Sequence, residues 1–199
     1  MALTLVSVLS LTACDGESSN DTPHAGQQPP TGWRIYGDAK LGFSIAYPAK
    51  WRVDRAHVYP NPIENARIAG VAFIIPPELT LHTNLSTESY LSVESAPAAG
   101  TCTPSAFLET TDTQRDEDQG SLHWSVATAG DAGAGNVYDE TLYALKGSHP
   151  CLAIRYFIHS TNVGNYTPGT VKEFDRAALV GMFDRIRSTF ALSQRGHKS

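Results

Sequence analysis

The alternation of hydrophobic and polar residues along this chain predicts a series of short β-strands. In the first half, strands are expected over residues 33–36, 43–47, 71–75 and 90–94. Phe43, Ile45 and Tyr47 share one face of the second strand, which is the period-2 pattern of a strand with one buried face. The run 71–75 is apolar throughout and ends at two prolines, as is typical of a central strand.

Three further strands are predicted in the second half, over residues 122–126, 137–145 and 152–158. The glycine-rich stretch 129–136 fits a hairpin connection between the first two. The charged stretch 112–120 is predicted to be a loop, and so is 59–62, because its two prolines cannot donate to a strand ladder.

Two helices are expected beside these strands. Thr103 and Pro104 are typical of an N-cap and a first helical position, which predicts a short helix through Leu108. Thr170 and Glu173 match a capping box, and apolar residues then recur at three- and four-residue steps. They are Val171, Phe174, Ala178, Met182, Phe183, Ile186 and Phe190. The whole pattern predicts an α+β fold, in which an antiparallel sheet is covered by helices and a long amphipathic helix ends the chain.

The N-terminal segment has the pattern of a bacterial lipoprotein signal peptide. An apolar run over residues 2–11 is too short to span a bilayer. It leads into Leu11-Thr12-Ala13-Cys14, which reads as a lipobox, the site at which a signal peptidase leaves a lipidated cysteine. We therefore expect a signal peptide over 1–13, a flexible polar tether over 14–32 and a single α+β domain over 33–199.

Lipid on Cys14 predicts a protein anchored to a bacterial membrane on its extracytoplasmic side. Asp15 follows Cys14, and in enterobacterial lipoproteins Asp at this position favours the inner membrane; the choice between inner and outer membrane stays open. No Lys or Arg precedes Arg34, so we expect the true start codon to lie upstream of Met1. The alternative is an ordinary buried N-terminal segment with a chance cysteine.

The chain contains three cysteines. An odd number in a secreted chain leaves one thiol to explain. If Cys14 carries lipid, Cys102 and Cys151 remain, and they are expected to form a disulfide that closes a loop of about 50 residues, worth roughly 4 kcal/mol. The alternative is two free buried thiols.

The stretch Gly42-Phe43-Ser44-Ile45-Ala46-Tyr47-Pro48-Ala49-Lys50-Trp51 resembles the opening of PsbP-like domains. The aromatic-rich end of the expected C-terminal helix is similar to their ending. This resemblance implies an α/β/α sandwich around an antiparallel sheet, with a binding or accessory role. The metal ligands of PsbP-like domains find no matching positions here. The segment 157–166 also resembles part of a group of uncharacterised bacterial lipoproteins.

A polar cluster lies where the last predicted strand runs into the following loop, and it is the best candidate for a binding site. It consists of Arg155, His159, Asn162, Asn165 and Tyr166. Strand alternation places Arg155, Phe157 and His159 on one face of that strand. Arg155 could hold an anionic group while His159 and Asn162 donate hydrogen bonds. The alternative is that the loop side chains bond to their own backbone and that Arg155 pairs with Glu140 on a neighbouring strand.

The sequence shows no established catalytic, metal-binding or nucleotide-binding motif. It has no Gly-x-Ser-x-Gly elbow, its seven histidines lack metal-ligand spacing, and its glycine-rich stretch lacks the lysine of a phosphate loop. An acidic stretch that begins at Asp116 departs from a calcium loop, since Ala127 stands where the bidentate Glu belongs. We therefore predict no catalytic residue, no metal and no cofactor.

Charge and motifs together favour a non-catalytic binding or accessory domain whose partner is unknown; another envelope protein is one candidate. The formal net charge of −5 and the absence of a Lys/Arg stripe argue against nucleic acid. Two alternatives stay open: a small hydrolase or ligand-binding enzyme that uses the Arg155/His159 region, and a purely structural envelope protein. A concave site that contains both residues would favour the enzyme, whereas a packed Arg155–Glu140 pair would argue against it.

Overall fold

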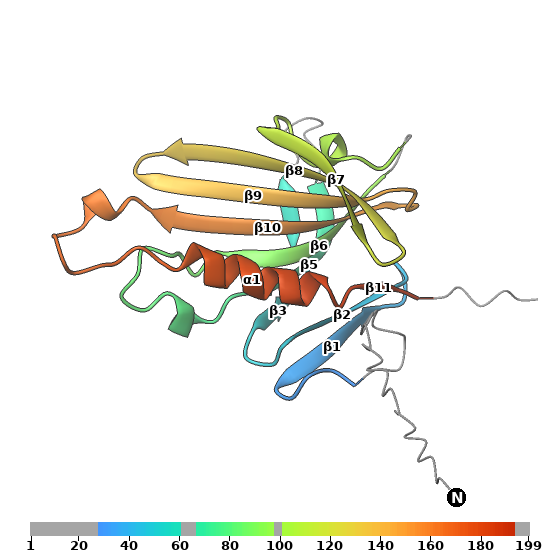
Figure 1. The fold of residues 1–199 in the computed structure, drawn as a ribbon, viewed down its shortest axis with the longest axis horizontal. Helices are drawn as coiled ribbons and strands as arrows, with labels where there is room; N and C mark the ends of the chain where they lie inside the picture. Colours follow the sequence, from blue (N-terminus) through green and yellow to red (C-terminus); the bar gives the residue numbers. More distant parts are fainter. Residues whose placement is uncertain (1–27, 61–66, 98–100, 194–199) are drawn as a thin grey trace, which may run out of the picture.

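A computed structural model describes residues 28–60, 67–97 and 101–193. In these residues the chain forms two antiparallel sheets and one α-helix (Figure 1). The smaller sheet has the order β1-β2-β11, with β1 at Trp33–Asp38, β2 at Phe43–Pro48 and β11 at Ala191–Leu192. The larger sheet has the order β3-β5-β6-β10-β9-β8-β7, and β4 also pairs with β5.

The strands of the larger sheet are mostly long. They are β3 (Arg52–Asp54), β4 (Val58–Pro60), β5 (Arg67–Ile74), β6 (Tyr90–Ala96), β7 (Thr113–Gln119), β8 (Leu122–Gly133), β9 (Asn136–Leu145) and β10 (Cys151–Thr161). The helix α1 covers Arg176–Arg187, and three 3-10 turns lie at Pro77–Leu79, Pro104–Ala106 and Val163–Asn165. No helix in the described residues has the length and apolar character needed to cross a membrane.

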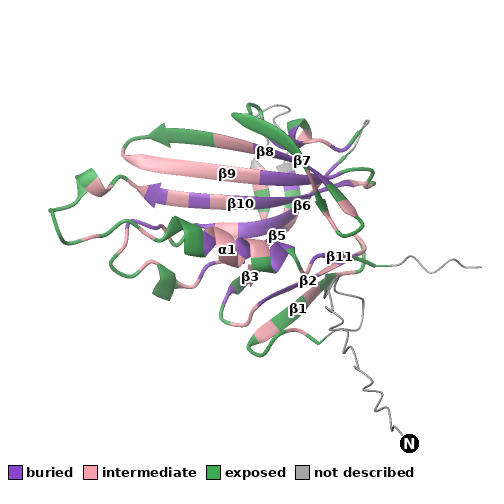
Figure 2. Cartoon of the chain, in the orientation of Figure 1, coloured by how far each residue is buried: buried purple, intermediate pink, exposed green. Residues whose placement is uncertain are grey.

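One face of the larger sheet packs against α1 and the smaller sheet (Figures 1 and 2). Phe183 and Ile186 of α1 are fully buried there, and Phe183 contacts Trp51 and Tyr156. The smaller sheet contributes Phe43, whose ring stacks on Phe190 just after the helix. Each large apolar side chain that is fully buried in this way contributes about 1.5–3 kcal/mol, so this interface is the main core of the domain.

The opposite face has no helical layer in the described residues. It is covered by the connection 101–112, in which Phe107 and Leu108 are buried against Leu142 and Ala144 of the sheet. The short helix predicted over 103–108 is only a 3-10 turn, and the Thr103 side chain does not cap it. The α/β/α sandwich expected from the sequence is therefore wrong: the fold is mostly antiparallel sheet, and α1 covers one face only.

The long C-terminal helix is also a wrong prediction. The helix has 12 residues, and its N-cap is Asp175, whose carboxylate accepts a hydrogen bond from the Ala178 N–H, rather than Thr170. Tertiary contacts hold the preceding residues in an extended form, because the Lys172 N–H donates to the His82 carbonyl and the Phe174 N–H donates to the Asn84 side chain. These bonds occupy backbone groups that a helix from Thr170 would need.

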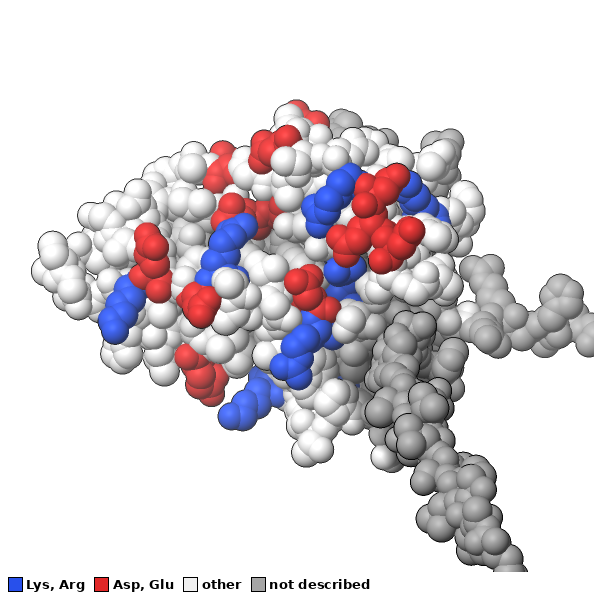
Figure 3. All heavy atoms as spheres, viewed as in Figure 1, with Lys and Arg blue, Asp and Glu red and all other residues white. Residues whose placement is uncertain are grey.

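The charged stretch 112–120, predicted to be a loop, contains the edge strand β7, which pairs with β8. Of the stretch 59–62, also predicted to be a loop, residues 59 and 60 belong to the edge strand β4, and 61 and 62 lie outside the described residues. β7 lacks an apolar face because it lies at the end of the sheet, where charged residues block pairing with other chains. Figure 3 shows its acidic side chains beside basic ones, and Asp116 pairs with Lys146 and Glu117 with Arg115.

The hairpin expected over 129–136 is confirmed, but its turn is tighter than the glycine content suggested. β8 continues to Gly133 and β9 begins at Asn136, so only Ala134 and Gly135 form the turn. Both have positive φ, at 50° and 82°, as a type I′ hairpin turn requires. The strands predicted around residues 33–36, 43–47, 71–75 and 90–94 are confirmed as β1, β2, β5 and β6.

Candidate functional site

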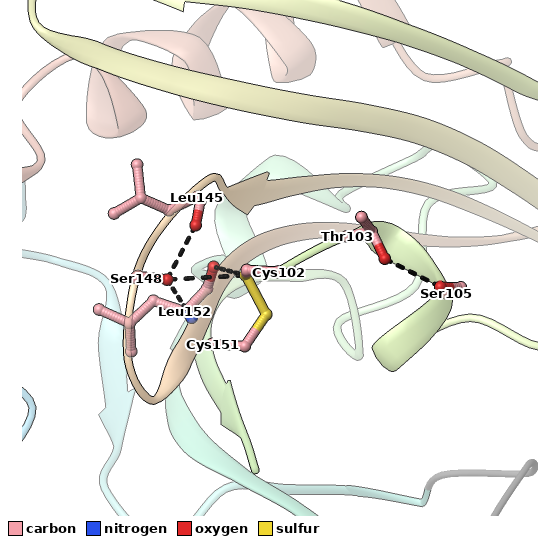
Figure 4. Close-up of a disulfide and its surroundings, with 7 residues drawn as sticks. All are labelled: Cys102, Thr103, Ser105, Leu145, Ser148, Cys151 and Leu152. Atoms are coloured by element: carbon pink, nitrogen blue, oxygen red, sulfur yellow. Dashed lines mark hydrogen bonds between the residues drawn. A yellow bond between two sulfur atoms is a disulfide. The ribbon is translucent and has the colours of Figure 1, made fainter. Parts of the chain in front are cut away.

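The predicted disulfide between Cys102 and Cys151 is present (Figure 4). The two Cα atoms are 5.1 Å apart, and both residues are buried. The bond fastens the covering connection to the first residue of β10. Ser148 supports it, because its hydroxyl donates to the Leu145 carbonyl at 2.8 Å and accepts from the Leu152 N–H at 2.9 Å. One end of the covered face is thus held covalently.

Arg155 of β10 lies in the middle of the same face and is completely buried. Its guanidinium donates to both carboxylate oxygens of Glu94 on β6, at 2.9 and 3.2 Å from Nε and 2.9 Å from Nη2. It also donates to Glu140 on β9 and to the Phe107 carbonyl. Since every nitrogen of the guanidinium has a partner, Arg155 is not free to bind an anionic ligand.

Glu94 is the most deeply buried carboxylate of this network, with no exposed surface. It accepts a further hydrogen bond from the Ser92 hydroxyl at 2.7 Å. The nearest imidazole nitrogen, His57 Nε2, is 3.7 Å from it, too far for a hydrogen bond. Arg155 and Glu94 therefore form a buried ion pair. Removing either side chain is costly, because it leaves the charge of the other one buried without a partner.

Stability should fall in acid because of Glu94. Burial by itself raises the pKa of this carboxyl group. The Arg155 guanidinium and the hydrogen bonds that Glu94 accepts outweigh burial and lower the pKa to about 2, from an ordinary value of 4.5. A lowered pKa means that the unfolded chain binds the proton first, so the stabilisation is complete above about pH 4.5 and disappears as the pH falls toward about 2.

Urea unfolding of the wild type and of Glu94→Gln between pH 7 and pH 2 checks this expectation. The stability advantage of the wild type over the variant should shrink within that acid window. An advantage that stays constant down to pH 2 would contradict it.

The larger sheet curls over this face. Tyr59 on β4 donates to Glu140 on β9 at 2.8 Å, and the Arg155 guanidinium lies 3.7 Å from the centre of the Tyr59 ring. β5, β6 and β10 separate β4 from β9 in the order of the sheet, so these contacts require strong curvature. Gly70 on β5 assists it, because a Cβ at this position would lie 2.5 Å from the Val93 carbonyl oxygen.

A line of aromatic rings continues from this network toward the far end of the face. We call it the aromatic row; it consists of His57, Tyr90, Phe157, Tyr138 and His159. Successive ring centres are 4.8, 4.9, 6.1 and 4.5 Å apart. All five residues are partly exposed. The row crosses β6, β10 and β9, because the Cα register places Phe157 opposite Tyr90 and His159 opposite Tyr138.

His159 ends the row and is held by side chains from two other segments. Its Nδ1 lies 2.9 Å from a Glu88 oxygen, and its Nε2 lies 3.0 Å from the Asn136 side-chain oxygen. Its ring is stacked on Tyr138 at an angle of 25°. His159 is therefore fixed in place at the edge of the face, with a partly exposed ring.

The remaining members of the predicted polar cluster do not join Arg155. Asn162 accepts from the Gly164 N–H and so fixes the 3-10 turn after β10, as the loop-fixing alternative expected. Asn165 donates to the Gly135 carbonyl of the β8–β9 turn, and Tyr166 is exposed. The Arg155–Glu140 pair offered as an alternative is present, and His159 lies about 13 Å further along the strand.

Of the five members of the aromatic row, the sequence indicated only His159 as a candidate binding residue, with Phe157 on the same strand face. His57, Tyr90 and Tyr138 come from segments far apart in the chain, and alternation within each strand gives no sign that they meet. The spacing of Phe157 and His159 on one face of β10 was the one available signal. In the described ranges, no group of three His, Cys, Asp or Glu side chains is arranged to hold a metal ion.

The solved structures similar to this chain include a cyanobacterial protein and a Bacteroides protein. Cyanobacterial PsbP (CyanoP) of Synechocystis sp. PCC 6803 shares 14% identity over 84% of this chain and 98% of its own, with a TM-score of 0.43. A protein of Bacteroides thetaiotaomicron VPI-5482 shares 12% identity over 83% of this chain, with a TM-score of 0.45, and this chain spans about half its length. No protein family and no curated protein sequence matches. These likenesses concern the fold and say nothing of activity.

Proposed function

We propose that this protein is an extracytoplasmic bacterial lipoprotein, anchored by lipid on Cys14, and that its folded domain is a non-catalytic module that binds another protein of the envelope. The aromatic row is the observation that supports binding. Five partly exposed ring side chains contact one another in series; four lie on one face of the larger sheet, and His57 lies in the connection between β3 and β4. Aromatic residues are enriched at the centres of protein interfaces.

The arrangement of the rings favours a protein over a sugar as the partner. Tyr90 and Phe157 are stacked at 17°, and Tyr138 and His159 at 25°. Because these neighbours cover one another's flat faces, the row presents ring edges, whereas stacking of a sugar ring needs an open aromatic face. Ring edges are suited to apolar side chains and to edge-to-face aromatic contacts.

The rigidity of the face is a further support. The disulfide and the Arg155 network hold β10 to the segments around it, so the row needs little ordering when a partner binds. Preorganisation of this kind reduces the entropic cost of association. A buried disulfide is also characteristic of oxidising compartments, which agrees with the proposed extracytoplasmic location.

A photo-crosslinker tests the proposed surface. Benzoylphenylalanine placed at Tyr138 should give one discrete adduct with another protein in membranes of the native host. The same group at Leu192, an exposed residue of the smaller sheet, should not give it, and Phe157→Ala should reduce it. An absent adduct at Tyr138, or an equal one at Leu192, would overturn the proposal.

The anchor has its own test. Mass spectrometry of the mature protein under non-reducing conditions should show an N-terminal lipidated Cys14 together with the intact Cys102–Cys151 bond. A mature chain that still begins at Met1 would overturn the proposed anchor, and it would leave the crosslinking test of the aromatic row unaffected.

A further inference from the structure

β1 is an edge strand of the smaller sheet, pairs with β2 and is directly adjacent to the tether predicted over residues 14–32. Its middle residue Ile35 is 54% exposed, and Arg34 and Gly37 are exposed too. An exposed apolar side chain on an unpaired edge is unusual, because free edges readily pair with another chain.

The ladder with β2 determines which backbone groups of β1 remain free. The Gly32 and Asp38 carbonyls accept hydrogen bonds from the Ala49 and Gly42 N–H groups. The backbone N–H and C=O groups of the even-numbered residues of β1 are therefore directed toward β2. In a strand, alternate residues point their N–H and C=O groups to opposite sides. Ile35 and Gly37 therefore direct theirs outward, where no group in the described part of the chain bonds to them.

A second copy of β1 fits this edge in one antiparallel register. If Ile35 of each copy lies opposite Gly37 of the other, the outward-facing groups form four hydrogen bonds around a two-fold axis near Tyr36. The same register places Arg34 of each copy opposite Asp38 of the other, at the pairs where side chains come closest. The edge is thus complementary to itself in both hydrogen bonding and charge.

The exposed Ile35 side chain is also accommodated in this register. Its partner Gly37 has no side chain, so the two Ile35 side chains meet diagonally above the two glycines. Burying each of them removes apolar surface from water at roughly 25 cal/mol per Å². From these observations we infer that the chain forms a symmetric dimer by antiparallel β1–β1 pairing, which joins the two smaller sheets into one six-stranded sheet.

This dimer is independent of the partner proposed above, since β1 and the aromatic row lie on different sheets. The contact is small, so its affinity in solution is modest. Anchoring of both copies to one membrane would raise their effective concentration and favour pairing. An isologous contact of this kind closes at two copies and does not extend into a fibre.

Cysteine crosslinking tests the register. Ile35→Cys and Gly37→Cys are made separately in the full chain with Cys14→Ser. The only other cysteines are then Cys102 and Cys151, which are bonded to each other. A Cβ at Gly37 meets nothing within 4 Å, so a side chain fits there. Directly opposite residues lie about 5.5 Å apart, within disulfide range, whereas the diagonal pairs of identical residues lie about 7–8 Å apart.

Mild oxidation of a mixture of the two variants should therefore give at least about tenfold more crosslinked dimer than either variant alone. Arg34→Asp introduced into both chains should sharply reduce the crosslink, because the new carboxylate then lies opposite the carboxylate of Asp38. The matched change Arg52→Asp on β3 should not reduce it. Circular dichroism confirms that these variants are folded. A mixture without a crosslink, or Ile35→Cys that crosslinks alone as well as in the mixture, would overturn the proposed dimer.

Discussion

Replacement of Arg155 by methionine should lower the free energy of unfolding by about 3–5 kcal/mol. The change leaves Glu94, which has no exposed surface, without its guanidinium partner, and Glu140 loses a hydrogen bond as well. Methionine keeps much of the volume and apolar stem of arginine, so the loss comes mainly from the uncompensated carboxylates. Chemical denaturation at neutral pH, with an unchanged m-value, measures it.

Arg115→Met is the matched control. Arg115 pairs with Glu117 at 3.0 Å on the exposed edge strand β7, and an exposed pair contributes about 0–1 kcal/mol. Adding Glu94→Leu to Arg155→Met should recover part of the lost stability, since it removes the buried carboxylate that Arg155→Met leaves without a partner. If Arg155→Met and Arg115→Met cost the same, the buried network stabilises the fold no more than an exposed pair does.

Loss of the disulfide should have an effect of similar size. The double variant Cys102→Ala/Cys151→Ala opens a loop with a sequence separation of 49 residues, and the chain-entropy model assigns roughly 4 kcal/mol to such a loop. The connection 101–112 also carries Phe107 and Leu108, which pack against Leu142 and Ala144 of the sheet, so its release would expose these apolar side chains. Thermal and urea unfolding of the variant and the wild type measure the difference.

Reduction of the wild type is the control for this variant. The reduced wild type and the double variant should unfold at nearly the same urea concentration, because both lack the crosslink and differ little in packing. A reduced wild type as stable as the oxidised protein would show that the bond adds nothing to the fold. The disulfide and Arg155 both hold the connection 101–112, because Arg155 donates to the Phe107 carbonyl and Cys102 is bonded to Cys151, so the two changes are expected to couple.

Part of this fold follows from the sequence alone. Strands with one apolar face were predictable because the alternation is strict: Phe43, Ile45 and Tyr47 are buried, as are Leu91 and Val93. The disulfide followed from the number of cysteines. Such features depend on residues that are close in the chain or on a simple count, so no knowledge of tertiary contacts is needed.

Other features were decided by contacts between distant segments. The helix was expected from Thr170, yet hydrogen bonds to His82 and Asn84 delay it to Arg176. β7 has no apolar alternation and forms only because β8 offers a partner. A helical cover over the second face was expected, but the connection 101–112 packs there instead. In each case a long-range bond outweighs a local preference worth only about 1 kcal/mol or less.

The candidate site likewise combines features that the sequence predicted with features that only tertiary contacts decided. From the sequence, alternation placed Arg155, Phe157 and His159 on one face of a strand, and that placement agrees with the structure. Only the tertiary structure decided their roles. The curl of the sheet brings Tyr59 over Arg155 and into a hydrogen bond with Glu140, so Arg155 is covered. The register of β6 and β9 with β10 adds Tyr90 and Tyr138 to the aromatic row. Register and curvature depend on the packing of the whole sheet, and a single strand does not encode them.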